Sequence, residues 1–174
     1  MQKLSLLNVS FPVAPLYWNP MRIGYGYDSH AFQPGVPLII GGVRLQHTHG
    51  LAGHSDGDVL LHALTDALLG AVAAGDIGSY FPPSDPKWKG ADSAIFVAEA
   101  LKQVRKAGYR VGNVDSCLIL AAPKIGPQAK AIQNRVAELL GIDPGGEGIK
   151  AKTPEGTGTD NAAIAHVTVL LEKL

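Results

Sequence analysis

Residues 54–73 read HSDGDVLLHALTDALLGAVA, and this stretch decides the fold of the 174-residue chain. Its apolar residues recur at helical spacing on one broad stripe and predict a helix over about 57–73: Val59, Leu60, Ala63, Leu64, Ala67, Leu68 and Ala71. Ser55, followed three residues later by Asp58, resembles a capping box at the start of this helix. The opposite stripe carries Asp58, His62, Thr65 and Asp66, and for a helix taken alone it predicts a solvated polar face.

The segment before this helix predicts strands and turns. Residues 21–27 alternate well enough for a first strand, which would deliver Asp28 and His30 at its end. Residues 38–45 suggest a short hairpin or an irregular strand pair, and 50–53 suggest a loop. Because strand side chains alternate between two faces, Asp28 and His30 lie on the same side of an extended segment.

The rest of the chain predicts an α+β fold. After the first helix we expect irregular structure over 76–86, a helix over 92–107, a strand over 111–120, a helix over 128–140 ended by Gly141, and strands over 148–153 and 164–171. This order is not a regular βαβ alternation, so it favours a mixed β-sheet with helices packed on one face. Residues 1–20 are expected to be an N-terminal extension, and residues 21–174 the functional domain.

The composition is that of an ordinary globular protein. Hydrophobic residues make up 46% and charged residues 17%, and fifteen acidic residues balance fifteen basic ones. This balance gives no support for a nucleic-acid partner or a membrane surface. A single cysteine, Cys117, rules out an intrachain disulfide framework, is expected in the core, and favours a cytoplasmic location.

Two clusters of carboxylates and imidazoles point to a metal. Asp28, His30 and His62 offer the donor set of a three-ligand zinc site with an open position for substrate. His54, Asp56 and Asp58 lie nearby in sequence, but Asp56 and Asp58 could instead be features of a helix N-terminus, and for Asp58 this capping role is the favoured interpretation. The His47-x-His49 pair falls in a polar loop, where solvent exposure is expected.

Two later segments could hold phosphate. Residues 121–127 combine a strand end with Lys124 and a following helix, and residues 150–159 are rich in small and hydroxyl side chains. Glu155, in the second segment, could bind Mg²⁺ shared with phosphate oxygens, although a flexible turn explains that segment equally well. The chain has neither a Walker-type phosphate loop nor a dinucleotide-binding glycine fingerprint.

Residues 21–174 resemble the 2-C-methyl-D-erythritol 2,4-cyclodiphosphate synthase family. The resemblance rests on four motifs: RIGYGYDSH at 22–30, HSDGDVLLHALTDALLG at 54–70, GDIG at 75–78 with Phe81-Pro82, and GNVD at 112–115. It implies a homotrimer with active sites between adjacent subunits, one Zn²⁺ and one Mg²⁺ or Mn²⁺ per site, and a cytidine diphosphate substrate. The implied reaction closes the cyclodiphosphate and releases CMP, as a step of non-mevalonate isoprenoid biosynthesis.

The resemblance also implies a role for each matching residue. Zinc would be held by Asp28, His30 and His62, with Asp28 and His30 also close to substrate. His54 would lie beside the β-phosphate and act with Glu155 in catalysis, Ser55 would fix the substrate, Thr153 would contact phosphate, and Glu155 would bind Mg²⁺ or Mn²⁺. The methylerythritol part would contact Asp76, Ile77, Gly78, Phe81 and Asp85, and the cytidine part Ala121, Pro123 and Lys124.

Two other functions are also compatible with these residues, and one segment departs from the family pattern. A zinc hydrolase using metal-bound water would also use such a triad. A trimeric module with a structural zinc is the other alternative, although structural sites are usually closed by four protein ligands. Many family members carry an arginine and a glutamate soon after the position of Glu155, and residues 156–163 of this chain lack both. The isoprenoid-diphosphate site associated with that segment at the trimer centre is therefore not carried over.

Overall fold

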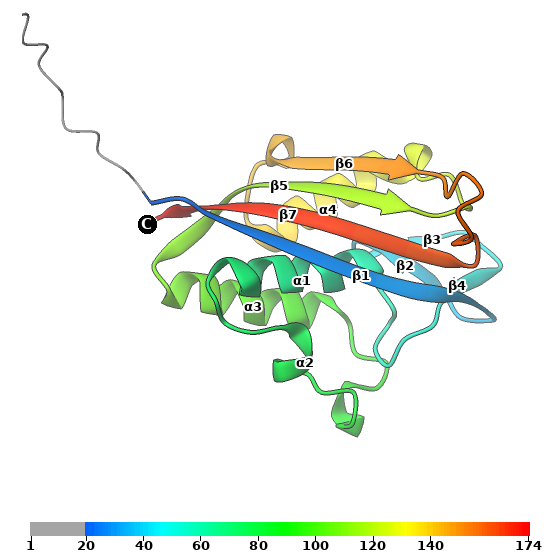
Figure 1. Cartoon of the computed structure of the whole chain (residues 1–174), viewed down its shortest axis with the longest axis horizontal. Coiled ribbons are helices and arrows are strands. Elements are labelled where there is room, and N and C mark those ends of the chain that lie inside the picture. Colours follow the sequence, from blue (N-terminus) through cyan, green and yellow to red (C-terminus); the bar gives the residue numbers. More distant parts are fainter. Residues whose placement is uncertain (1–19) are drawn as a thin grey trace, which may run out of the picture.

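The computed structural model describes residues 20–174 and contains a five-stranded mixed sheet, which can be followed in Figure 1. The strands lie in the order β4 (His49–Leu51), β1 (Arg22–Pro34), β7 (Ala162–Lys173), β5 (Tyr109–Ile119) and β6 (Glu147–Lys152). Neighbouring strands are antiparallel except β5 and β6, which are parallel. A separate hairpin joins β2 (Leu38–Ile40) to β3 (Val43–Leu45) through two glycines with positive φ, Gly41 and Gly42.

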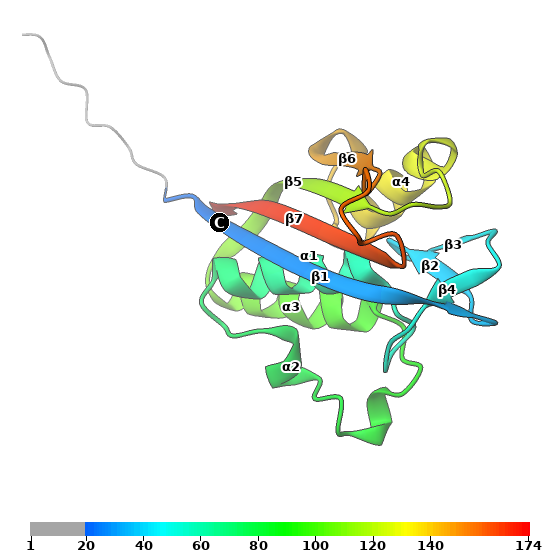
Figure 2. The same cartoon turned by 45° about the vertical axis from the view of Figure 1, so that its right-hand side comes forward.

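The helices cover one face of this sheet (Figures 1 and 2). α1 (Val59–Ala71) packs against β1 and β7, α3 (Ala94–Lys106) packs against α1, and α4 (Ala129–Leu140) packs against β6. The segment expected to be irregular contains two short helical turns, α2 (Ile77–Tyr80) and η1 (Pro86–Trp88). Two further turns are η2 (Gly126–Gln128) and η3 (Pro144–Gly146). The predicted α+β class, with a mixed sheet and helices on one face, is confirmed.

α1 is buried on almost every side, which corrects the prediction of a solvated polar stripe. Thr65 is fully buried and donates its hydroxyl to the carbonyl oxygen of Leu61 at 2.7 Å. Asp58 is also fully buried, whereas His62 and Asp66 are half-buried. The reason is tertiary: α3 covers the side of α1 that faces away from the sheet.

The start of α1 differs from the predicted capping box. Asp58, and not Ser55, is the N-cap, and its side chain accepts hydrogen bonds from the backbone N–H groups of Leu60 and Leu61. The same carboxylate accepts from the N–H groups of Gly41 (2.9 Å) and Gly42 (2.6 Å). Asp58 therefore fixes the β2–β3 turn to the start of α1, and its assignment as a capping residue is confirmed.

Two glycines let α1 lie close against β1. A Cβ atom on Gly24 would lie 1.9 Å from the carbonyl oxygen of Ala67, and one on Gly26 would lie 1.9 Å from that of Ala63. Residues 24, 26, 28 and 30 share one face of β1, because side chains alternate along a strand. The close approach at the glycines therefore brings the helix to the strand face that carries Asp28 and His30.

Other differences from the predicted elements have simple causes. β1 runs on to Pro34, because its later half pairs with β7 and β4, so Asp28 and His30 lie within the strand and not at its end. That pairing also makes His49–Leu51 a strand, where a loop was expected over 50–53. Cys117 is half-buried on the open face of β5, opposite the buried Leu118, so the expectation of a core cysteine was wrong. Within residues 20–174, no helix has both the length and the apolar character needed to cross a bilayer.

Candidate metal centre and phosphate site

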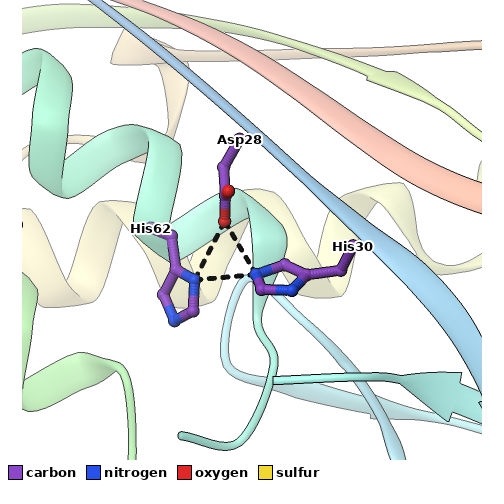
Figure 3. Close-up of side chains that lie close together, drawn as sticks. All are labelled: Asp28, His30 and His62. Carbon is purple, nitrogen blue, oxygen red and sulfur yellow. Dashed lines mark hydrogen bonds and ion pairs between the residues drawn. The ribbon is translucent and has the colours of Figure 1, made fainter. Parts of the chain in front are cut away.

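Asp28, His30 and His62 point their donor atoms at a common position (Figure 3). Oδ2 of Asp28 lies 2.8 Å from Nε2 of His30 and 2.9 Å from Nδ1 of His62, and the two nitrogens are 3.0 Å apart. Two ligands come from alternate positions of β1 and the third from the second turn of α1. The sequence-predicted triad is therefore assembled in space.

The charge states within the triad are interdependent. Burial opposes ionisation of Asp28, but the contacts of its carboxylate with the imidazoles of His30 and His62 outweigh it and hold the pKa of Asp28 well below its ordinary value. Burial likewise opposes charge on His30, but Asp28 beside it raises the pKa of His30 above its ordinary value. Asp28 is thus a ready anionic ligand, whereas a metal must displace a proton from His30 at acidic pH.

The donor set fits a zinc ion. Two imidazoles and one carboxylate are the kind of three-ligand set found in catalytic zinc sites, which keep a fourth position open. A tetrahedral ion about 2.0–2.1 Å from each donor holds the donors roughly 3.3 Å apart. The separations of 2.8–3.0 Å need to widen by only a few tenths of an ångström.

The other ring nitrogen of His62 is bound by two serines. Nε2 lies 2.9 Å from Oγ of Ser55 and 2.9 Å from Oγ of Ser93. Ser93 is fully buried and donates its hydroxyl to Oδ1 of Asp56, while its backbone N–H donates to Oδ2 of Asp56 at 3.0 Å. Sequence reasoning missed Ser93 because it is 31 residues from His62 and begins another helix.

A cavity of about 170 Å³ opens beside the triad. Predicted site residues form part of its wall, namely His30, His54, Ser55, His62, Ile77, Gly78 and Phe81. Trp88 and Phe96, which the sequence did not single out, complete an aromatic side: the ring centroids of Phe81 and Phe96 are 4.4 Å apart and those of Phe81 and Trp88 are 4.8 Å apart. Such a wall suits the carbon skeleton of a small substrate.

Short hydrogen bonds hold the segment that carries Ile77 and Gly78. The N–H of Ile77 donates to Oδ1 of Asp66 at 2.7 Å, one turn of α1 beyond His62. Asp76 caps α2 by accepting from the N–H and the hydroxyl of Ser79, and these bonds lower the pKa of Asp76. The predicted site residue Asp76 is thus exposed and next in sequence to Ile77, which lines the cavity, and one oxygen of its carboxylate accepts both hydrogen bonds from Ser79.

Asp85 and His54 meet through the backbone. The Asp85 side chain accepts from the N–H of Lys87 at 3.0 Å and caps η1, whereas its carbonyl oxygen lies 3.3 Å from Nε2 of His54. His54 is exposed at the cavity. The contact between His54 and Asp85 places residues 81–88 next to the loop that precedes α1.

The remaining predicted residues line a second cavity of about 360 Å³, where β5 and β6 end. Its wall includes Ala121, Pro123, Lys124, Thr153 and Glu155. The Thr153 hydroxyl donates to the Glu155 carboxylate, and Glu155 has a φ of 50°. The two predicted phosphate segments are therefore brought together, but His54 and Glu155 line different cavities of the single chain.

Comparisons with known proteins agree with this geometry. A protein named 2-C-methyl-D-erythritol 2,4-cyclodiphosphate synthase from Koribacter versatilis is 69% identical over 153 residues, which cover 88% of this chain and 99% of that protein. A solved structure of a synthase of that name in a CDP-bound form matches with a TM-score of 0.82 at 41% identity, covering 86% of this chain and 99% of the other. A Plasmodium falciparum IspF complex with CDP matches with a TM-score of 0.77 at 34% identity, covering 89% and 97%. The YgbB family matches residues 21–172, and this chain belongs to that family, the 2-C-methyl-D-erythritol 2,4-cyclodiphosphate synthases.

Proposed function

We propose that this chain converts 4-diphosphocytidyl-2-C-methyl-D-erythritol 2-phosphate to 2-C-methyl-D-erythritol 2,4-cyclodiphosphate and CMP, as a step of non-mevalonate isoprenoid biosynthesis. The observation that carries the proposal is the convergence of Asp28, His30 and His62 beside an aromatic-walled cavity, in a chain 69% identical to a synthase of that name. An oxygen of the 2-phosphate attacks the β-phosphorus and forms a new P–O bond. The bond from the β-phosphorus to the bridging oxygen breaks, and CMP leaves with that oxygen.

Positioning and charge neutralisation account for most of the catalysis of phosphoryl transfer, so no protein nucleophile is required. Asp28, His30 and His62 hold Zn²⁺, and Glu155 holds Mg²⁺ or Mn²⁺, one of each per site. When bound, these ions neutralise charge on the two phosphates of the diphosphate. His54 and Glu155 are the residues we assign to catalysis, His54 through a ring that is exposed at the cavity.

The substrate is divided between the two cavities. Ile77, Gly78 and Phe81 bind the methylerythritol part, with Asp76 and Asp85 at the rim, and Ser55 fixes its phosphate side. Ala121, Pro123 and Lys124 bind the cytidine part, and Thr153 contacts phosphate. The support for the second assignment is that these residues and Glu155 share one wall, in a fold whose relatives are recorded with CDP.

We infer a homotrimer in which the two cavities meet between adjacent copies. Within one chain, His30 and His62 of the metal triad line one cavity and Glu155 lines another, so neither cavity holds the whole site. The face of β1 turned away from the helices also exposes Ile23 (70%), Tyr25 (59%) and Tyr27 (48%). An apolar strip of this kind marks an interaction surface. The division at residue 20 and the cytoplasmic location stay predictions.

Phosphorus NMR of the reaction tests the function. The protein with the cytidyl substrate and Mg²⁺ is expected to yield CMP and the cyclic product in equal amounts, with no inorganic phosphate. Inorganic phosphate or an open-chain product would show hydrolysis instead, and the absence of CMP would contradict the proposal. His62→Ala is expected to lose at least a hundredfold in turnover, whereas Glu138→Gln on the exposed side of α4 is expected to match wild type.

A further inference from the structure

Ser93 occupies an N-cap position but does not act as a cap. It precedes the first residue of α3, where serine commonly accepts a hydrogen bond from the backbone of the first turn. Within the described part of the chain, its side chain makes no such bond. Asp92 takes over that task by accepting from the N–H of Ala94 at 2.8 Å. The buried Ser93 hydroxyl is thus available for another purpose.

That hydroxyl connects a carboxylate to a metal-ligand histidine. It donates to Oδ1 of Asp56 and lies 2.9 Å from Nε2 of His62. Asp56 is itself held by the N–H of Asp58, which donates to Oδ1 at 3.2 Å, and by the N–H of Ser93, which donates to Oδ2 at 3.0 Å. The chain Asp56–Ser93–His62 therefore joins the loop before α1, the start of α3 and the second turn of α1.

The direction of these hydrogen bonds determines the tautomer of His62. A hydroxyl has one hydrogen, and the hydrogen of Ser93 is directed to Asp56, so the Ser93 oxygen can only accept from His62. Nε2 of His62 must then carry a proton, and in a neutral ring this leaves the lone pair on Nδ1. Nδ1 is the atom that faces Asp28 and His30.

The neighbouring serine does not impose the same direction. Ser55 is also 2.9 Å from Nε2, but its nearest other partner is the N–H of Gly57 at 3.5 Å, and no carboxylate among residues 20–174 accepts its hydrogen. Taken alone, Ser55 could donate to Nε2 or accept from it, so it does not determine the tautomer; with Nε2 protonated, it accepts. Only the connection to Asp56 makes the Ser93 hydroxyl a one-way acceptor.

We propose that Ser93 and Asp56 are positioning residues that fix the tautomer and orientation of His62 for metal binding. The proposal rests on the metal site of the proposed function. Partners of this kind commonly change metal affinity 10–100-fold when they are removed, although they never touch the metal. Ser93→Ala is therefore expected to weaken Co²⁺ binding by about 10–100-fold.

Asp56→Asn tests the same connection at its other end. The amide nitrogen of asparagine can donate to the Ser93 oxygen, which allows the hydroxyl to turn toward Nε2 and favours the wrong tautomer. A loss of roughly tenfold or more in Co²⁺ affinity is expected. Because Asp56 acts through Ser93, the double variant is expected to bind Co²⁺ within about threefold of Ser93→Ala alone.

The measurement uses full-length protein freed of metal by a chelator and titrated with Co²⁺ in the absence of substrate. The visible d–d absorption of tetrahedral Co²⁺ reports both affinity and geometry, and circular dichroism checks the fold of each variant. Ser116→Ala is the matched control, because Ser116 is equally buried and donates to the carboxylate of Glu147, away from the triad. It is expected to leave Co²⁺ affinity unchanged, and Ser93→Thr, which restores the hydroxyl, is expected to recover most of the affinity.

The outcomes separate this proposal from the metal site itself. If wild type binds Co²⁺ no better than His62→Ala, the metal site and the positioning proposal both fail. If wild type binds well and Ser93→Ala binds within twofold of it, only the positioning proposal is overturned. Should Ser93→Ala fail to fold, Asp56→Asn decides the question: weaker binding supports the proposal and unchanged binding overturns it. Losses that simply add in the double variant would also overturn it, because a purely structural effect would add.

Discussion

We expect the buried Glu147 to make the stability of this protein depend on pH. The side chain is 1% exposed at the start of β6, and its Oε2 has no hydrogen-bond partner among residues 20–174. Burial raises the pKa of Glu147 to about 7, against the hydrogen bond that Oε1 accepts from Ser116 at 2.8 Å. The nearby Asp115 raises this pKa further, and Lys150 opposes it.

The direction in which stability changes with pH depends on whether the folded or the unfolded chain binds the Glu147 proton more tightly. The folded chain holds the Glu147 proton up to about pH 7, whereas the unfolded chain releases it near the ordinary pKa of 4.5. The contribution of Glu147 to the unfolding free energy is therefore most favourable at low pH. It decreases as the pH rises from about 4.5 to 7 and no longer changes above that range. A difference of about 2.5 pKa units is equivalent to about 3 kcal/mol, of which about 2–3 kcal/mol is lost between pH 5 and pH 8.

Glu147→Gln isolates this effect. Glutamine keeps an acceptor for Ser116 but cannot ionise. The unfolding free energy of the variant, relative to wild type, is therefore expected to rise by about 2–3 kcal/mol as the pH goes from 5 to 8. Urea unfolding across this range measures it, at one protein concentration because the stability of an oligomer depends on concentration. Glu138→Gln removes a charge from a side chain that is 70% exposed, and it is expected to change stability by less than about 0.5 kcal/mol at any pH. A stability difference between Glu147→Gln and wild type that stays constant from pH 5 to pH 8 would refute the reasoning.

Three further predictions concern the fold and the metal. Gly26→Ala is expected to lower the unfolding free energy by about 3 kcal/mol, because its Cβ would lie 1.9 Å from a carbonyl oxygen of α1. Gly70→Ala is the control: the nearest atom to its Cβ is 4.0 Å away, so it should be neutral or stabilise the protein by up to about 1 kcal/mol. Asp58→Ala leaves four backbone N–H groups without their acceptor and is expected to lower stability by about 3–5 kcal/mol in chemical denaturation; a loss below 1 kcal/mol would contradict its bridging role. Zn²⁺ at about 100 times its Kd should add about 2.7 kcal/mol to wild type, visible as a higher Tm, and an equal gain in His62→Ala would argue against the triad.

Local pattern predicted most of the elements because periodicity and turn residues are local properties. The hairpin over 38–45, the helix ended by Gly141, and the α+β class all follow from short stretches of sequence. The predictions that were wrong concern residues whose structure depends on contacts with distant segments of the chain. β1 continues past Tyr27 because β4 and β7 supply hydrogen-bond partners, and Thr65 is buried because α3 covers it.

The sequence by itself determined the ligand types of the metal triad and their spacing. Asp28 and His30 share a face because strand side chains alternate, and the residue pattern around them carries the family resemblance. The sequence offered His62 as the third ligand, but only the tertiary structure brings it to Asp28 and His30, because α1 packs closely against Gly24 and Gly26. The tertiary structure also places Ser93 between Asp56 and His62. Ser93 lies at the start of another helix, and its contacts with both residues form only when the chain folds.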